Sequence, residues 1–267
     1  SYFAAEKILV RCLYGMEHNI KHKFLCLRKT QPAVRKSVFD LMLEYIGNWD
    51  LSKACHVNRS VMEITFRNGT QIICGGLDDP EKLKSIQGIT SVWLEEATEM
   101  NVNDFTQVDL RLRGATPSYK QIIISFNPIS ETNWVKKRFF DAFTAESLVL
   151  TDLPNTERRK TEVKVKGKPL TVFTTLHHST YKDNRFIDRQ YIAILEDLVT
   201  KDRNFHNVYT LGKWGVLKGL IYDNWDIVKE WPEKFEHHGF GLDFGFSNNE
   251  AALIEVGIAG EEIWERG

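Results

Sequence analysis

Cysteine is scarce and scattered in this sequence. Its four cysteines, Cys12, Cys26, Cys55 and Cys74, stand far apart, form no C-x-x-C pair and have no histidine at zinc-ligand spacing nearby. This spacing excludes the common structural zinc sites and does not suggest a disulfide framework. We therefore expect four reduced, buried thiols in a protein of the cytoplasm.

Long hydrophobic runs are missing as well. The opening stretch, SYFAAEKILVRCLYGMEHN, carries Glu6, Lys7 and Arg11 inside its apolar pattern and lacks a small-residue cleavage site. Such a segment is neither a signal peptide nor a membrane span. The sequence also contains no internal repeat and no low-complexity tract. We expect no membrane partner.

An excess of charge of one sign is the third missing feature. The 267 residues include 35 Lys and Arg against 36 Asp and Glu, which is a formal net charge of −1. The field of the whole molecule is therefore weak, and any binding to nucleic acid must come from local basic patches. A hydrophobic fraction of 42% suffices for a real core, so we expect one large domain, or one domain and part of another.

Strands and helices alternate in the first half of the chain. Apolar residues at helical spacing predict a helix that begins almost at Ser1, and the pair Asn68-Gly69 predicts a hairpin turn. The expected strands are 22–28, 61–66, 70–74, 91–94 and 121–125, and the further helices are 33–46, 102–112 and 131–143. This alternation predicts an α/β fold with a doubly wound, mostly parallel sheet.

The pattern loosens beyond residue 150. A polar, basic segment at 154–168 predicts an exposed loop or hairpin, and helices are expected at 188–199 and 203–211. A junction rich in Trp and Gly, GKWGVLKGLIYDNWD, precedes three short strands that begin at His238. We expect these tryptophans to bury the surface of an interdomain junction, since aromatic residues beside a linker usually do so.

Two adjacent acids end the apolar strand at 91–94. Ligands of open α/β sheets bind beyond the carboxyl ends of the strands, so Glu95 and Glu96 stand where a nucleotide would be held. Neighbouring side chains on a strand point to opposite faces. Glu95 can then hold Mg²⁺ through water, while Glu96 orients and deprotonates the attacking water. The alternative is a solvated strand end that caps the next helix.

Polar residues also follow the next buried strand. Ser125 and Asn127 come at the matching edge of the sheet, where such groups can sense a γ-phosphate or the water that attacks it. The alternative is a simple Asn-Pro turn at Asn127-Pro128.

A phosphate-binding loop is not present, because the sequence contains no G-x-x-x-x-G-K-[ST] motif. Ser1 opens the first helix and a strand follows that helix, which is the place where such a loop joins its helix. We therefore expect Ser1 to be the final residue of a phosphate-binding loop whose other residues precede it.

A family resemblance rests on six pieces in order. They are GLDDPEKLKSIQGITSVWLEEATEM, DLRLRG, IIISFNPISETNWVKKRFF, HHSTYKDNRFI, GKWGVLKGLIYDNW and GLDFGFSNNEAAL. Together these pieces, which cover essentially the whole chain, resemble the large terminase subunit of tailed bacteriophages. The resemblance implies a P-loop, ASCE-type ATPase domain at 1–150, a linker, lid and interdomain junction at 151–235, and the first strands of a ribonuclease H-like α/β nuclease domain at 236–267.

The resemblance also implies roles for single residues. Glu95 matches the magnesium-linked acid of the family and Glu96 its catalytic glutamate, while Ser125 and Asn127 match the motif that couples hydrolysis to movement. Many relatives have Asp where this chain has Glu95, and both are carboxylates. Candidates for the cation that neutralises the transferred phosphoryl group are Lys84, Arg111 and Arg113, which are otherwise solvated or paired helix charges.

Asp243 in GLDFGFSNN is the nuclease candidate. A carboxylate in the middle of a first apolar strand, with Gly241 and Gly245 clearing space around it, is how a two-metal nuclease presents its first ligand. The alternative is an Asp that stabilises a turn at a strand end.

Basic residues gather in the segment expected to be a loop or hairpin. The candidates for contact with DNA are Arg158, Arg159, Lys160, Lys164, Lys166 and Lys168. Such a patch can hold phosphates without reading bases, although most basic runs are solvated faces. The pair His177-His178 is expected to be buried strand and rim, not a metal site.

The resemblance finally implies cofactors and partners. The cofactors are ATP and Mg²⁺, with Mn²⁺ as an alternative at the nuclease site. The partners are double-stranded DNA, the portal protein of the procapsid, the small terminase subunit and further copies of the chain in a ring on the portal. We expect a motor, located in the host cytoplasm and transiently at the portal vertex, that translocates viral DNA into procapsids and cuts concatemers. Two alternatives are a helicase-like or recombinase-like ATPase and a scaffold that has lost nucleotide binding.

Overall fold

The computed structural model describes residues 1–78, 85–141, 148–149, 155–165, 168–216, 228, 231–243, 252–260 and 262–266. The chain divides into two compact units, Ser1–Leu217 and Lys218–Gly267. The boundary falls inside the segment expected to be a linker and lid, so that most of this segment belongs to the first unit.

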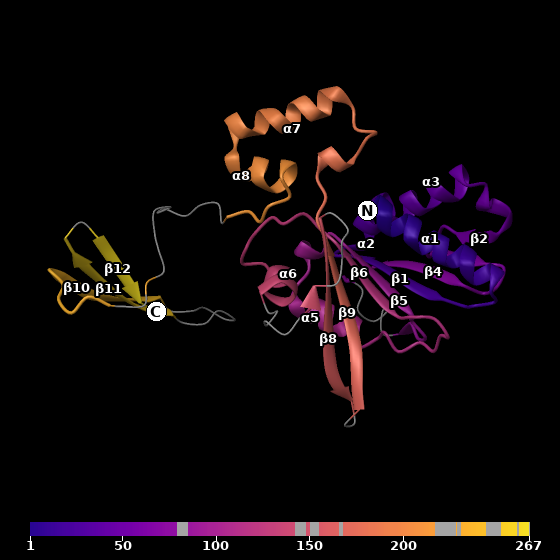
Figure 1. Cartoon of the computed structure of the whole chain (residues 1–267), viewed down its shortest axis with the longest axis horizontal. Coiled ribbons are helices and arrows are strands. Elements are labelled where there is room, and N and C mark those ends of the chain that lie inside the picture. The colour runs from indigo at the N-terminus through magenta and orange to yellow at the C-terminus, as the bar shows by residue number, and fades with distance from the viewer. Residues whose placement is uncertain are drawn as a thin grey trace. The chain divides into compact units, whose positions relative to one another are not determined.

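A six-stranded sheet forms the centre of the first unit (Figure 1). Its strands, in spatial order, are β2 (Cys55–Asn58), β3 (Glu63–Phe66), β4 (Gln71–Gly76), β1 (Lys23–Arg28), β5 (Ser91–Glu95) and β6 (Gln121–Ser125). The four strands from β4 to β6 are parallel, and β3 and β2 add antiparallel pairs at one edge. The expectation of a mixed α/β fold with a mostly parallel sheet is therefore confirmed.

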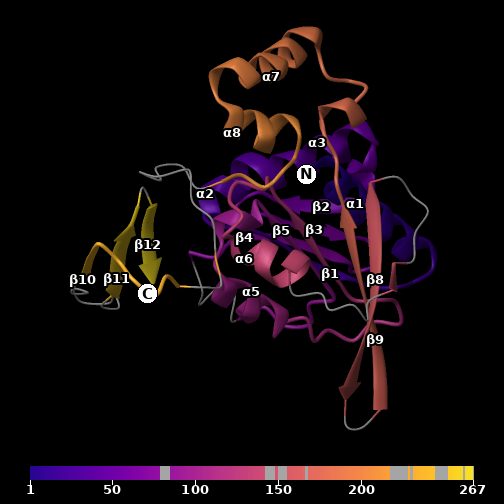
Figure 2. The ribbon, with the colours of Figure 1, turned by 60° about the vertical axis from the view of Figure 1, so that its left-hand side comes forward.

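Helices cover both faces of this sheet because its central strands are apolar on both faces (Figure 2). All five residues of β5 are buried, as are the four inner residues of β1. One face packs against α1 (Tyr2–Glu17), α2 (Gln31–Val34), the π-helical turn η1 (Arg35–Phe39) and α3 (Asp40–Asn48). The other face packs against α5 (Val102–Asp109), α6 (Trp134–Lys136) and the π-helical turn η4 (Lys137–Asp141).

Several element boundaries differ from the expected ones. The helix expected at 131–143 begins only at Trp134, because the side chain of Asn133 caps it by accepting a hydrogen bond from the Val135 amide at 3.0 Å. The helix expected at 102–112 ends at Asp109. Strand β2 was not expected at all.

A long hairpin follows the sheet. Strands β8 (Thr156–Val165) and β9 (Lys168–His177) pair antiparallel along their whole length, and β7 (Leu148–Val149) joins β8. The segment expected to be a loop or hairpin is thus a hairpin, and its second strand continues to His177. Beyond it lie η5 (Tyr181–Asp183), α7 (Arg189–Lys201), α8 (Arg203–Phe205) and η6 (His206–Thr210), which belong to the segment expected to be a linker and lid and are here called the lid elements.

The second unit contains three antiparallel strands in the order β10 (His237–Asp243), β11 (Ala252–Ala259) and β12 (Glu262–Arg266). The expectation of three short strands in this part of the chain is confirmed. None of the helices in the described ranges is long and apolar enough to cross a membrane.

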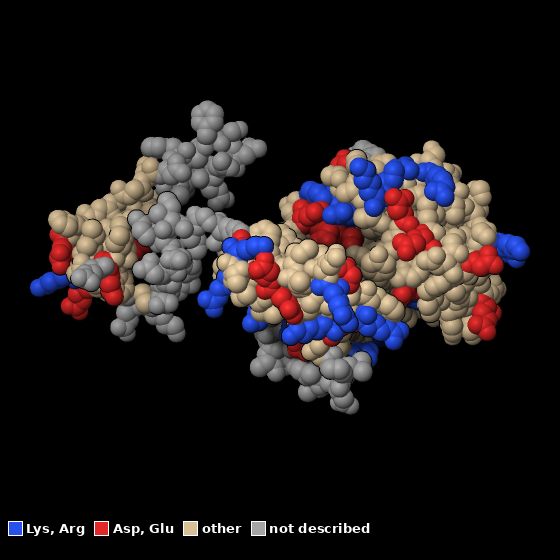
Figure 3. All heavy atoms as spheres, turned by 90° about the horizontal axis from the view of Figure 1, so that it is seen from above, with Lys and Arg blue, Asp and Glu red and all other residues tan. Residues whose placement is uncertain are grey.

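Charge is mixed on the surface of the first unit. Basic and acidic side chains are interspersed on the side shown in Figure 3.

Candidate functional site

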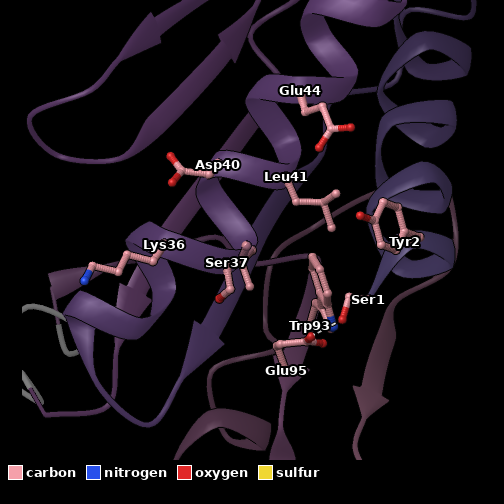
Figure 4. A pocket seen from close by; sticks show the side chains of 10 residues that line it. Ser1, Tyr2, Lys36, Ser37, Asp40, Leu41, Glu44, Trp93 and Glu95 are labelled. Atoms are coloured by element: carbon pink, nitrogen blue, oxygen red, sulfur yellow. Dashed lines mark hydrogen bonds between the residues drawn. The ribbon is translucent and has the colours of Figure 1, made fainter. Parts of the chain in front are cut away.

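A pocket of about 310 Å³ lies between the start of α1, the segment from η1 to α3, and the end of β5 (Figure 4). It is lined by Ser1, Tyr2, Lys36, Ser37, Val38, Asp40, Leu41, Glu44, Trp93 and Glu95. It is therefore beside the opening helix and at the carboxyl end of the central strand, where a nucleotide site was expected.

Both carboxylate oxygens of Glu95, which lines this pocket, accept hydrogen bonds. It ends β5, is 4% exposed, and pairs in register with Ser125 at the end of β6. One carboxylate oxygen accepts a hydrogen bond from Ser1 Oγ, and the other accepts one from Ser125 Oγ. Three residues that the sequence analysis singled out, including two that are 94 positions apart, thus meet at one carboxylate.

Glu96 is placed differently from its neighbour. Its backbone is left-handed, with φ 52° and ψ 51°, so β5 ends before it and the 3-10 turn η3 (Ala97–Glu99) begins after it. The expected alternation of the two acids along one strand is therefore wrong, because the chain turns between them. Glu96 is half-buried and, unlike Glu95, is not among the residues that line the pocket.

The environment of Glu96 favours its protonated form. Burial raises the pKa of Glu96 above its usual value, and the neighbouring charge of Glu95 raises it further. The positive charge of Arg28 opposes this effect. A carboxylate with a raised pKa is a better proton acceptor than an exposed one, which is the property that a general base requires.

Arg28 is a basic residue at this edge that the sequence analysis missed. It ends β1, next to β5, and its guanidinium contacts Glu99 Oε1 at 3.1 Å and Ser37 Oγ at 3.5 Å. Among the described residues, its buried Nε has no hydrogen-bond partner. The signal was available, because Arg28 ends a buried strand at the same edge as the two acids. Lys36, a second cation that was missed, lines the pocket but extends away from Glu95 (Figure 4).

Of the three expected cations, the two in the described residues, Arg111 and Arg113, do not line the pocket. Lys84 lies outside the described residues, and Arg111 is half-buried. The amide of Gly114, next to Arg113, donates to Ile89 O at 2.7 Å, before the amino end of β5. The backbone next to Arg113 therefore lies before the amino end of β5, whereas the two acids stand at its carboxyl end. The role of Arg111 or Arg113 at a phosphate, in the same subunit or in a neighbouring one, stays a prediction.

The segment after β6 turns toward η3. The Asn127 carbonyl accepts hydrogen bonds from Thr98 Oγ1 at 3.4 Å and from the Ile129 amide at 2.8 Å, and the Asn127 side chain is exposed. The turn that the alternative interpretation expected is therefore present. Its coupling role stays a prediction.

The basic residues of the hairpin divide between two faces, because side chains alternate along a strand. Arg158 lies over the Phe173 ring, with 4.4 Å to the centroid, and Lys160 pairs with Glu162 at 2.9 Å on the same face. Arg159 points to the other face. It binds Glu157 and donates to the Phe139 carbonyl at 3.1 Å.

Arg159 is therefore better explained as an anchor of the hairpin on η4 than as a contact for DNA. Lys168 is exposed, Lys164 takes part in β8, and Lys166 lies outside the described residues. His177 and His178 are exposed, not buried. The described residues contain no cluster of three His, Cys, Asp or Glu side chains that could hold a metal ion.

Asp243 pairs with Ala252 at the last described position of β10. A Cβ atom at Gly241, two residues earlier, would meet nothing within 4 Å, which fits the expectation of open space there. Gly245 lies outside the described residues. The metal role of Asp243 stays a prediction.

Comparisons with known proteins agree with the fold. The family model described as "Phage terminase large subunit" matches residues 1–213. The PBSX phage terminase large subunit of Bacillus subtilis is 30% identical over 98% of this chain and 59% of its own length, and the large subunit of Bacillus phage SPP1 is 25% identical over 86% and 52%. The chain thus spans little more than half the length of these relatives.

A solved structure shows the same fold at lower identity. The large terminase of the thermophilic bacteriophage D6E superposes with a TM-score of 0.51 at 19% identity, over 96% of this chain and 58% of that one. Since the family model covers most of the sequence, the chain belongs to the phage terminase large subunit family.

Proposed function

We propose that this chain carries the ATP-hydrolysing core of a large terminase, a motor that translocates double-stranded viral DNA into procapsids. The observation that carries the proposal is the meeting of Ser1, Glu95 and Ser125 beside the pocket. Membership of the terminase family supports the same function.

The oxygen atoms around Glu95 fit a magnesium ion. Mg²⁺ prefers oxygen ligands and in P-loop ATPases is held by a hydroxyl at the end of the phosphate loop and by an acid on the neighbouring strand. Ser1 Oγ and the Glu95 carboxylate supply that pair and lie in hydrogen-bond contact. When bound, Mg²⁺ would neutralise charge on the phosphates of ATP.

Glu96 is the proposed general base. It would accept a proton from the water that attacks the γ-phosphorus, while the bond from that phosphorus to the bridging oxygen breaks and ADP leaves. Its raised pKa and its position next to Glu95 support this role. Arg28 is a cation whose charge acts on Glu96, so we assign it a supporting electrostatic role.

Contact with DNA is proposed for one face of the β8–β9 hairpin. Arg158 and Lys160 project from this face of β8, and the exposed aromatic ring of Phe173 lies under Arg158. Such contacts hold the phosphate backbone without reading sequence, which a motor that moves along any DNA requires.

The remaining parts of the proposal come from the family. The strands of the second unit would begin a ribonuclease H-like nuclease domain with Asp243 as a metal ligand for Mg²⁺ or Mn²⁺. The portal protein, the small terminase subunit and further copies in a ring would be partners, and the host cytoplasm and the portal vertex would be the location.

The test is DNA-stimulated ATP hydrolysis by the full-length gene product. We expect Glu96→Gln to lower kcat by about 10²- to 10⁴-fold, the usual contribution of a general base. Glu17→Gln is the matched control, because Glu17 ends α1 on the protein surface. Equal turnover of the wild type and Glu96→Gln would remove Glu96 from the mechanism. An inactive wild type would favour a scaffold, and DNA-stimulated hydrolysis without packaging would favour a helicase-like ATPase.

A further inference from the structure

Arg28 lies at the same edge of the sheet as the two acids and on the face of the pocket. Cys26 of β1 is paired in register with Trp93 of β5. Arg28 and Glu95 each stand two residues further along, so they reach the edge at the same level. Residues two apart on a strand share a face, and both Cys26 and Trp93 pack in the core beneath α1 and α3. Arg28 and Glu95 therefore project to the same face, which is the one that carries the pocket.

The guanidinium of Arg28 has N–H groups to spare. An arginine carries five N–H donors in a planar fork. Among the described residues, one terminal nitrogen donates to Glu99 Oε1 at 3.1 Å, and the other lies 3.5 Å from Ser37 Oγ, at the outer limit of a hydrogen bond. The buried Nε has no partner among these residues. Because a buried donor without a partner is costly, this guanidinium is suited to a further acceptor.

The contact of Arg28 with Glu99 is a weak one. The Arg28 side chain is 19% exposed and the Glu99 side chain 44%, so water screens the pair and its contribution to stability is small. Glu99 belongs to the turn η3, which begins directly after Glu96. An acceptor with more charge than a carboxylate, bound beside the two acids, can therefore compete with Glu99 for the guanidinium.

Ser37 brings Arg28 to the wall of the pocket. Ser37 lines the pocket, and its hydroxyl group donates to the Ala33 carbonyl at 2.7 Å. Since its proton is used in this way, Ser37 Oγ faces Arg28 as an acceptor. The guanidinium thus borders the pocket, although Arg28 is not one of the residues that line it.

Two other cations of this region are directed elsewhere. The ammonium group of Lys29 pairs with Asp104 Oδ2 at 2.9 Å, in the first turn of α5. Lys36 lines the pocket but extends away from the carboxylate there (Figure 4). Of these three cations, Arg28 is the one whose charge acts on Glu96.

We propose that Arg28 contacts the transferred phosphoryl group of ATP bound to the same subunit, and that Glu99 holds the Arg28 guanidinium while no triphosphate is bound. This inference rests on the proposed function and adds a catalytic residue to it. A planar guanidinium fits two phosphoryl oxygens at once, whereas the ammonium group of a lysine acts as a point charge.

The contribution of Arg28 to the reaction is electrostatic. The oxygen of the attacking water forms a bond to the γ-phosphorus while the bond from this phosphorus to the bridging oxygen breaks. The electron pair of the broken bond stays on ADP, and Glu96 takes the proton of the water. The N–H groups of Arg28 donate to the phosphoryl oxygens and neutralise charge there. ADP lacks this phosphoryl group, so its binding does not involve Arg28.

The test compares the affinities of the full-length gene product for ADP and for a non-hydrolysable ATP analogue. Both are measured with Mg²⁺ by isothermal titration calorimetry, at a dilution where light scattering shows a monomer. We expect Arg28→Gln to raise the Kd of the analogue at least about tenfold, as for the loss of a charged hydrogen bond, while the Kd of ADP stays within about twofold. Arg28→Lys, which keeps the charge and loses the fork, should lie between Arg28→Gln and the wild type. The kcat of Arg28→Gln should fall about 10³-fold.

Lys29→Gln is the matched control for Arg28→Gln. It removes the same charge from the next residue and breaks the ion pair with Asp104. We expect both dissociation constants and kcat of this variant to stay within about twofold of the wild type, because an exposed ion pair contributes little.

Glu99→Gln tests the holding contact. This substitution keeps the size of the side chain and removes its charge, so the analogue should bind about two- to fivefold more tightly, the equivalent of one exposed ion pair. Removing an acid also favours a triphosphate through general charge. The decisive comparison is therefore Glu99→Gln in the Arg28→Gln background, where we expect the gain to vanish.

The outcomes distinguish the inference from the function on which it rests. Unchanged affinity for the analogue in Arg28→Gln, or equal weakening of ADP and the analogue, overturns the contact with the phosphoryl group. If Arg28→Gln does not fold, the same two readings of Arg28→Lys decide. No gain from Glu99→Gln, or a gain that persists without Arg28, overturns the holding role of Glu99. A wild type that binds neither nucleotide and hydrolyses no ATP in the presence of DNA overturns the proposed function itself.

Discussion

The indole nitrogen of Trp93 donates a hydrogen bond to Ser125 Oγ at 2.7 Å, which joins the two neighbouring strands at the edge of the pocket. Trp93 is fully buried, and the same Ser125 hydroxyl contacts the Glu95 carboxylate. The buried indole N–H of Trp93 thus orients the Ser125 hydroxyl at the candidate ATP site. The Ser125 Oγ atom therefore takes part both in the pairing of β5 with β6 and in the contact with the Glu95 carboxylate.

Replacing this oxygen should destabilise the protein. Ser125→Ala leaves the Trp93 N–H without its partner, and an unpaired buried donor costs about 1–3 kcal/mol. We expect this loss in the free energy of unfolding, measured by urea titration. Trp93→Phe removes the donor, so adding Ser125→Ala to Trp93→Phe should cost less than Ser125→Ala alone. Strictly additive effects in this double-mutant cycle would show that the hydrogen bond contributes nothing.

His22 should make the protein less stable in acid. This side chain is 4% exposed and its Nδ1 has no hydrogen-bond partner among the described residues. Burial, followed by the charge of Arg11, lowers the pKa of His22 to about 4. As the pH falls from about 6.5 to about 4, the unfolded chain binds a proton at His22 that the folded protein does not, so the free energy of unfolding decreases.

The loss at His22 is at most about 3 kcal/mol and is complete near pH 4, below which both states are protonated. In His22→Leu this contribution is absent, so the variant should gain on the wild type as the pH falls through that window. The measurement is chemical denaturation at several pH values, with His56→Gln, at an exposed position of β2, as the control. Parallel stability curves for the wild type and His22→Leu would contradict the assignment.

The parallel sheet could be predicted because its signal is local. Strands β1, β5 and β6 are short apolar runs separated by helical patterns, and this arrangement is typical of a wound sheet. The position of Glu95 and Ser125 at one edge then follows from parallel pairing. Strand β2 has no such signal, because its four residues alternate between half-buried and exposed at the sheet margin and depend on pairing with β3.

The parts of the site that escaped prediction depend on backbone direction or on distant contacts. The left-handed residue Glu96 could not be recognised from a sequence in which Glu95 and Glu96 are adjacent carboxylates. Arg158, Arg159 and Lys160 form one basic run in the sequence, but pairing in a hairpin sends Arg159 to the opposite face. The contact of Trp214 with Phe126 joins positions 88 residues apart. The periodicity of hydrophobic residues carries no information about contacts at that separation.

The two faces of the hairpin should differ in their effect on DNA binding. The double substitution Arg158→Ala with Lys160→Ala removes two charges from the face that carries Phe173. We expect weaker binding to double-stranded DNA and a salt dependence, log K against log salt concentration, that is shallower by about 1.8, because each lost phosphate contact removes about 0.9. The measurement is fluorescence anisotropy of labelled DNA at several salt concentrations.

The control for the hairpin prediction removes two charges elsewhere. Lys182→Ala with Lys201→Ala changes the net charge by the same amount on exposed lid elements. We expect this variant to keep the wild-type slope. Equal slopes in both double variants would mean that the hairpin face does not contact phosphates.

Glu95 should control the affinity for magnesium. Glu95→Gln keeps the size of the side chain, but its amide oxygen can accept from only one of Ser1 and Ser125, and the substitution removes the negative charge that attracts the cation. We expect the Mg²⁺ concentration that half-saturates binding of a fluorescent, non-hydrolysable ATP analogue to rise about 10- to 100-fold, the usual effect of removing a group that orients a metal through its ligands. Glu44→Gln, which changes another acid of the same pocket, should leave this concentration unchanged. If instead both substitutions shift it equally, the pocket attracts the ion only by its general charge and Glu95 holds no special position.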